Sequence, residues 1–109
     1  MKNKTEEYFN AFNSQDLDKL REIYAEGMCL RDWTHDGEGV CGKENVISAN
    51  QELFNSVESL NIDVLFMHAD GDVVACEILV HLGEETIKVV DVITFDEEGK
   101  IKSLRAYVG

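Results

Sequence analysis

The second half of the chain consists of segments in which apolar and polar residues alternate with a period of two, the spacing of a half-buried β-strand. Short turn sequences rich in Gly, Asp and Glu separate these segments and are typical of hairpin connections. The pattern predicts long antiparallel strands at residues 59–69, 72–82, 87–95 and 100–108.

The first half of the chain carries helical periodicity instead. Clusters of apolar residues at helical spacing predict helices at residues 5–14, 16–26 and 43–57. Ser14 or Asp16 is expected to cap the second helix, and Gly27 is expected to end it. A short strand at residues 28–33 and a loop rich in Gly and Asp are expected before the third helix.

Helices followed by a series of long strands are typical of an α+β fold. The 109 residues can bury one core, so residues 1–109 are predicted to form a single domain. Because neither layer can bury its apolar side alone, we expect three N-terminal helices packed on a cone-shaped, curved antiparallel β-sheet. The open end of such a cone is a natural pocket for a small molecule.

The chain is acidic, with 10 basic and 22 acidic residues and a formal net charge of −12. This balance argues against binding to nucleic acid or to an anionic membrane through a general basic surface. No apolar run approaches the roughly 18 residues that a membrane-spanning helix needs. The N-terminal residues also lack the apolar segment of a secretory signal, so a cytoplasmic protein is expected.

The cysteines Cys29, Cys41 and Cys76 are widely spaced and form no CxxC pair. A disulfide framework and a structural zinc site are therefore not expected, and the thiols are predicted to be reduced. The histidines show no metal-ligand spacing either. No metal ligands are assigned.

Asp91 lies on the apolar face of a predicted strand, two residues from Val89 on one side and from Ile93 on the other. If the helices pack on this face, the carboxyl is buried, and desolvation favours its neutral form, which can donate a hydrogen bond. Two alternatives remain open. Asp91 could be a core residue that holds a hydroxyl or backbone group, or a bulge could turn it to the other face.

Tyr8, Asp32 and Asn50 are further candidates, each with an ordinary structural alternative. Tyr8 lies beside Phe9, which suits a core tyrosine whose hydroxyl needs a partner. Asp32 ends the short strand at the rim of a loop, where a loop-capping carboxylate is commoner than a base. Asn50 lies on the apolar stripe of the third helix, and a pocket lining is one way to satisfy an interior amide.

The order of these features resembles the NTF2-like superfamily, in particular its ketosteroid isomerase and SnoaL-like branch. The similarity covers nearly the whole chain and is carried by "YFNAFNSQDLDKLREIYAEGMCLRD", "GKENVI" and "VVDVITFDEEGKIKSLRAYVG". The resemblance implies a cystatin-like α+β roll with a small apolar ligand in its cone. It also implies a homodimer formed through the sheet.

In the isomerase pattern, a tyrosine and a protonated aspartic acid form an oxyanion hole, while a second aspartate moves the proton. Ketosteroid isomerase is an established example of a carboxylic acid kept neutral by an apolar site. The resemblance puts Tyr8, Asp91 and Asp32 at these three positions, in that order. It implies C=C isomerisation by allylic proton transfer in a small apolar carbonyl compound, with no metal or organic cofactor.

The resemblance further assigns the substrate pocket to Tyr24, Trp33, Asn50, Phe54 and Val108. Tyr24 matches a family tyrosine that forms a hydrogen bond near the first one. Trp33, Asn50 and Val108 replace a proline, a pocket tyrosine and an aromatic wall residue, which argues against a steroid-sized substrate. The alternatives are a non-catalytic small-molecule-binding or dimerisation module, and another SnoaL-like reaction such as that of a cyclase or dehydratase.

The outer face of the sheet is the expected dimer surface. Val90 and Val92, together with the apolar residues of the strand at 73–82, leave apolar surface that the helices cannot cover from the other side. Exposed patches of this kind usually mark interfaces.

Overall fold

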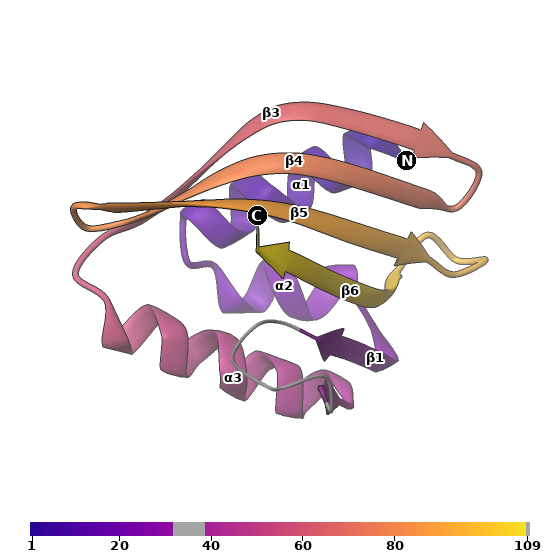
Figure 1. The fold of residues 1–109 in the computed structure, drawn as a ribbon. Helices are drawn as coiled ribbons and strands as arrows, with labels where there is room; N and C mark the ends of the chain where they lie inside the picture. The colour runs from indigo at the N-terminus through magenta and orange to yellow at the C-terminus, as the bar shows by residue number, and fades with distance from the viewer. Residues whose placement is uncertain (32–38, 109) are drawn as a thin grey trace.

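The computed structural model describes residues 1–31 and 39–108. Within these residues the chain forms three helices and six strands (Figure 1). The elements are α1 (Lys2–Asn13), α2 (Leu17–Ile23), β1 (Tyr24–Arg31), β2 (Val40–Cys41), α3 (Lys43–Ser56), β3 (Leu60–Asp70), β4 (Val73–Leu82), β5 (Glu85–Phe95) and β6 (Ile101–Val108).

The strands form one sheet in the order β2-β1-β6-β5-β4-β3, against which the helices pack (Figure 1). β3 to β6 pair antiparallel in sequence, as predicted. Register shifts between Val64 and Phe66 in β3, and between Thr94 and Phe95 in β5, bend the sheet around the helices. These features confirm the predicted α+β fold, with three helices on a curved sheet.

One pairing differs from the predicted antiparallel arrangement. β1 lies parallel to β6, with Leu30 opposite Leu104, so the sheet is mixed. Parallel neighbours need a long connection, and the chain from β2 to β5 provides it. This pairing brings β1 into the sheet beside β6, where Leu30 joins the apolar inner face.

The second helix is shorter than predicted. Asp16 caps it, since the side chain accepts a hydrogen bond of 3.1 Å from the backbone N–H of Lys19. The helix ends at Ile23 and β1 begins at Tyr24, so Gly27 lies in a strand and the prediction that it ends the helix is wrong. Packing explains the difference, because the extended backbone buries the large Tyr24 ring in the core.

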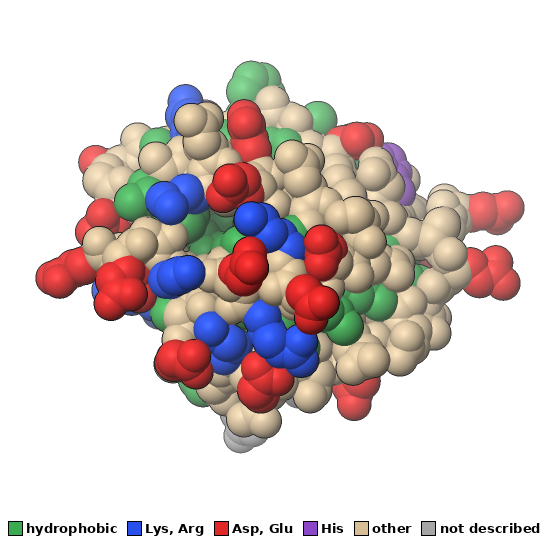
Figure 2. Space-filling view, turned by 180° about the vertical axis from the view of Figure 1, so that it is seen from behind, with side chains coloured by type: hydrophobic (Ala, Val, Ile, Leu, Met, Phe, Trp, Pro, Cys, Tyr) green, Lys and Arg blue, Asp and Glu red, His purple; other side chains and the backbone are tan. Residues whose placement is uncertain are grey.

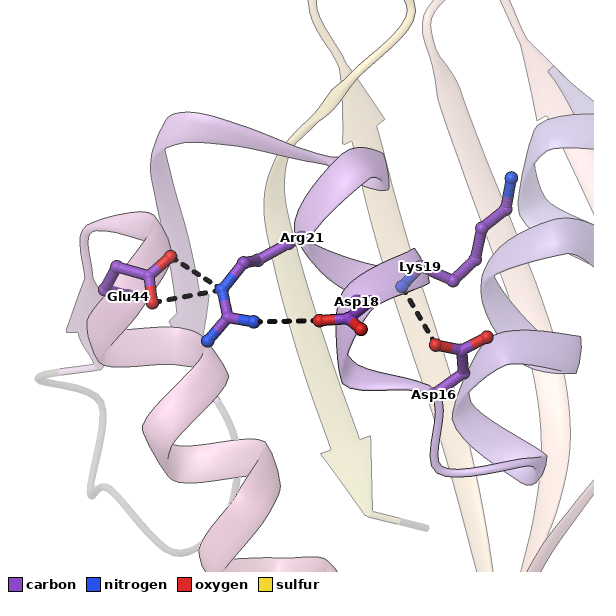
Figure 3. Close-up of polar contacts among 5 residues, drawn as sticks. All are labelled: Asp16, Asp18, Lys19, Arg21 and Glu44. Carbon is purple, nitrogen blue, oxygen red and sulfur yellow. Dashed lines mark hydrogen bonds and ion pairs between the residues drawn. The ribbon is translucent and has the colours of Figure 1, made fainter.

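An exposed ionic cluster joins α2 to the first turn of α3 (Figure 3). Nε of Arg21 lies 3.1 and 3.0 Å from the two carboxylate oxygens of Glu44, and Nη1 lies 3.3 Å from Oδ1 of Asp18. Exposed pairs of this kind contribute little to stability, because solvent screens them. The cluster links α2 to α3, the helix that carries Asn50.

Cys29 on β1 and Cys41 on β2 form a disulfide, which corrects the prediction that all three cysteines are reduced. The two residues are directly paired across the antiparallel strands, with Cα atoms 4.1 Å apart. Sequence spacing gave no sign of this contact, because β2 has only two residues and its composition is that of a loop. Cys76 is a free, buried thiol, as expected.

The two sides of the molecule differ in character. Figure 2 views the helical side and shows acidic and basic side chains interleaved over it. On the outer face of the sheet, Phe66, Val90 and Tyr107 are exposed. Strand pairing places them in one row across the sheet, with Glu77 between Phe66 and Val90. We call these three apolar side chains the outer-face patch. None of the described helices is long and apolar enough to cross a membrane.

Candidate functional site

A cavity of about 400 Å³ lies between the helices and the inner face of the sheet. Its walls come from α1 and α3 on one side and from β1 and β3 to β6 on the other, and most of its lining side chains are aliphatic. The polar side chains that line it include Tyr8, Asn50 and Asp91, three of the residues selected from sequence. The fold therefore brings these residues, which are far apart in the chain, into one apolar chamber.

Asp91 projects from β5 into this chamber. Its neighbours on the same face, Val89 and Ile93, are buried, and Asp91 is only 5% exposed. The residues opposite it are small, namely Cys76 on β4 and Ala106 on β6. The inward orientation predicted from the alternating pattern is thus observed, and the alternative of a bulge that reverses the face does not apply.

Tyr8 is buried on the inner side of α1. Its ring centroid lies 5.0 Å from that of Phe9, 5.7 Å from that of Phe12 and 6.4 Å from that of Tyr24. Burial raises the pKa of the Tyr8 hydroxyl well above its ordinary value, and the nearby Tyr24 and Asp91 raise it further. The group is therefore a neutral phenol at physiological pH and can donate a hydrogen bond.

The Tyr24 hydroxyl donates a buried hydrogen bond of 2.6 Å to Oδ1 of Asn50, which links β1 to α3 beside the cavity. Burial, and then the nearby Asp91, raise the pKa of Tyr24. Asn50 is 5% exposed and lines the cavity. Asn50 therefore faces inward, as its place on the apolar stripe of α3 predicted.

Two other residues predicted for the pocket, Phe54 and Val108, do not line the cavity. Phe54 is buried behind Phe12, with ring centroids 5.0 Å apart, and is not part of the cavity lining. Val108 faces the inner side opposite Val89, but it is 47% exposed at the end of β6 and does not line the cavity. Asp32 and Trp33 lie outside the described residues.

Sequence reasoning missed Glu52 and Ser56 on α3, which also line the cavity. Both side chains are exposed. They lie one helical turn apart, since residues four positions apart share a helix face. Their place beside the apolar stripe was the available signal, but polar residues at the edge of a stripe usually face solvent.

The chamber has a definite charge character. Glu52 and Asp91 are the acidic residues in its lining, and among the described lining residues none is Lys, Arg or His. Burial, and then Asp91, raise the pKa of the neighbouring Cys76 thiol to about 12, so this thiol is neutral. No group of His, Cys, Asp and Glu among the described residues is arranged to hold a metal ion. Such a chamber suits a neutral, largely apolar molecule with a few hydrogen-bond acceptors.

Comparison with known proteins agrees with this architecture. The family described as "SnoaL-like domain" matches residues 5–104 of the chain. No curated protein matches it. The fold is similar to that of a protein from Kribbella flavida DSM 17836 that is provisionally described as a ketosteroid isomerase, with a TM-score of 0.86 and 19% identity over 97% of this chain and 75% of that one.

Two further solved structures are similar. A SnoaL-like protein of unknown function from Burkholderia thailandensis E264 has a TM-score of 0.85 and 20% identity, covering 95% of this chain and 89% of that one. A protein from Shewanella denitrificans OS-217, provisionally described as a SnoaL-like polyketide cyclase, has a TM-score of 0.88 and 17% identity. The match covers 99% of this chain and 89% of that one. At these identities the likeness establishes the fold alone.

Proposed function

Because the chain belongs to the SnoaL-like family, we propose that it is a ketosteroid isomerase-like enzyme that moves an allylic proton in a small apolar carbonyl compound. The observation that carries this proposal is the joint presence of Tyr8 and the buried Asp91 in one apolar cavity. A neutral phenol and a neutral carboxylic acid are two donors for one carbonyl oxygen. Asp32 is assigned as the base from its position in the sequence.

The reaction needs only proton transfers. The Asp32 carboxylate removes a proton from the carbon between the carbonyl and the C=C bond, and the C–H electron pair shifts to form a dienolate. Tyr8 and neutral Asp91 stabilise the negative charge on its oxygen through hydrogen bonds. Protonated Asp32 then returns the proton at the far end of the conjugated system, which regenerates the carboxylate and leaves the C=C bond conjugated with the carbonyl.

Oxyanion-hole donors and general bases have known effects on reaction rates in other enzymes. Removing one oxyanion-hole donor costs about 10²–10³ in rate, and general-base assistance contributes about 10²–10⁴. The effect of the donors depends on an environment of low polarity, because hydrogen bonds to a developing charge are stronger where water is excluded. The aliphatic walls around Asp91 meet this requirement.

A turnover assay tests the proposal. Wild-type protein should convert small β,γ-unsaturated ketones to their α,β-unsaturated isomers, which absorb in the near ultraviolet. Asp32→Asn should abolish this conversion without unfolding the protein, because the change is isosteric, whereas Asp70→Asn at an exposed strand end should leave it unchanged. No turnover across a panel of ketones that do bind would instead indicate a non-catalytic binding module.

The proposal includes a homodimer formed through the outer face of the sheet. The outer-face patch supports it, because Phe66 is 62% exposed and Tyr107 is 54% exposed in a single chain. Large apolar side chains aligned on a rigid sheet are typical of interfaces between protein subunits. A second copy of the same surface would cover them.

A further inference from the structure

The Asn50 side chain presents a hydrogen-bond donor to the cavity that the proposed mechanism does not use. Asn50 lies on α3, whereas Tyr8 and Asp91 lie on α1 and β5. Its carbonyl oxygen already accepts the hydrogen bond from the Tyr24 hydroxyl. The orientation of the amide therefore decides what Asn50 offers to a ligand.

That orientation follows from the needs of Tyr24. The Tyr24 side chain is almost fully buried, and no other group among the described residues accepts a hydrogen bond from its hydroxyl. If the amide were turned around, Nδ2 would donate to the Tyr24 oxygen and the hydroxyl hydrogen would have no acceptor. A buried donor without a partner costs about 1–3 kcal/mol, so Oδ1 faces Tyr24 and Nδ2 faces away.

Nδ2 must then contact the cavity. No fully buried side-chain nitrogen or oxygen atom among the described residues lacks a hydrogen-bond partner. None of these residues forms a hydrogen bond with Nδ2 of Asn50, so this nitrogen is reachable from outside. The accessible space that Asn50 borders is the cavity.

The proposed carbonyl site does not need this donor. A carbonyl oxygen has two lone pairs, and Tyr8 and Asp91 together supply two donors. A third donor on a different element is available for another acceptor atom. The absence of Lys, Arg and His from the described lining residues, together with the acidic Glu52, disfavours an anionic acceptor.

We propose that Asn50 is a specificity-determining residue, whose Nδ2 donates a hydrogen bond to a second oxygen of a neutral substrate, apart from the carbonyl held by Tyr8 and Asp91. The substrate class is then a neutral, largely apolar compound with two oxygen acceptors. This inference rests on the proposed function, because that function assigns the first oxygen. It names a feature of the substrate that the reaction itself does not require.

Binding of matched ligands tests the inference. The ligands are β-tetralones that carry an isopropyl, acetyl or carboxylate group at each position of the aromatic ring in turn. These three groups have the same number of heavy atoms and differ in acceptor and charge. At one ring position, wild-type protein should bind the acetyl compound about 3- to 10-fold more tightly than the isopropyl compound, the effect of one neutral hydrogen bond. The carboxylate should bind more weakly than the acetyl compound.

Variants of Asn50 assign the preference to its amide. Asn50→Leu should remove the preference for acetyl over isopropyl. Asn50→Leu leaves the Tyr24 hydroxyl without its acceptor. The double variant Tyr24→Phe/Asn50→Leu removes both polar groups together, which avoids the free-energy cost of an unpaired buried hydroxyl. Tyr24→Phe alone retains Asn50 and should retain a preference for acetyl.

A measurement on the wild-type protein does not depend on variants. The side-chain N–H resonances of Asn50 in nitrogen-15 spectra should shift when the acetyl compound binds and stay in place when the isopropyl compound binds. No preference for acetyl at any ring position, equal weakening of both ligands by Asn50→Leu, or tighter binding of the carboxylate would overturn the inference.

The two proposals fail separately. A protein that prefers the acetyl ligand through Asn50 but turns over no unsaturated ketone retains this assignment and loses the proposed reaction. A protein that isomerises ketones without any preference for a second oxygen does the opposite.

Discussion

Cys76 and Asp91 lie directly opposite each other on β4 and β5, so a thiol and a carboxyl group share the buried face of the sheet. The thiol pKa is raised to about 12 by burial and then by Asp91. Cys76 therefore stays neutral beside the proposed acid.

Substitution of Asp91 should separate hydrogen-bond donation from acidity. Asp91→Asn keeps a neutral donor, so kcat on a β,γ-unsaturated ketone should fall modestly. Asp91→Leu removes the donor and should lower kcat by about 10²–10³. Tyr8→Phe should cause a loss of similar size.

The charge state of Asp91 can be measured in the same work. Carbon-13 spectra of the folded protein at neutral pH should show the Asp91 side chain with the chemical shift of a carboxylic acid. A carboxylate shift at Asp91, or equal activity of the Asn and Leu variants, would remove Asp91 from the oxyanion hole.

Stability should decrease at alkaline pH. The pKa values of Tyr8, Tyr24 and Cys76 are raised in the folded protein, mainly by burial. Above their ordinary values of 10.0 for tyrosine and 9.0 for cysteine, the unfolded chain releases protons that the folded chain retains. The free energy of unfolding then falls by up to about 1.4 kcal/mol per pH unit for each group.

Urea unfolding at several pH values checks this sign. The stability from these groups is fully present below about pH 9 and is lost as pH rises toward the folded pKa values. Tyr24→Phe should lessen the slope, because it removes one of the buried ionisable groups. A flat stability profile from neutral pH to about pH 11 would contradict the burial of Tyr8, Tyr24 and Cys76.

Thiol counting should reveal the cysteine arrangement. The folded protein should expose no reactive thiol, because Cys29 and Cys41 are joined and Cys76 is buried. Unfolding without a reductant should release one thiol, and unfolding after reduction should release three. Three thiols in the unreduced, unfolded protein would show that the disulfide does not form.

The outer-face patch should hold a dimer together. Sedimentation at micromolar concentration should give twice the chain mass of 12.3 kDa. Val90→Lys places a charge at the centre of the patch row and should yield monomers with unchanged secondary structure. Glu7→Lys, on the exposed side of α1, serves as the control and should remain dimeric. A monomeric wild-type protein would refute this part of the proposal.

The sequence pattern predicted which cavity residues face inward better than it predicted the contacts between distant elements. Asp91 could be placed inside because β5 has a long, regular alternation, and one register places every side chain on a definite face. The helical spacing of Asn50 gave its inward direction for the same reason. Its bond to Tyr24 was not predicted, because that contact depends on how β1 and α3 are packed.

The misplaced features depend on contacts between distant residues. Gly27 looked like a helix end, yet burial of the Tyr24 ring selects a strand before that glycine is reached. The Cys29–Cys41 pair depends on a strand of two residues, which has no periodicity to detect. Val108 shares the inner face of Val89 but extends beyond the cavity, because it is the last residue of its strand.

The parallel pairing of β1 with β6 has a consequence for the time course of folding. β1, at residues 24–31, pairs with the two-residue strand β2 on one side and with β6, at residues 101–108, on the other. The hairpins of β3 to β5 can form from neighbours in sequence, whereas β1 must wait until a loop of most of the chain has closed. Contacts of such large sequence separation slow folding, so docking of β6 beside β1 should be the late, rate-limiting step that completes the cavity.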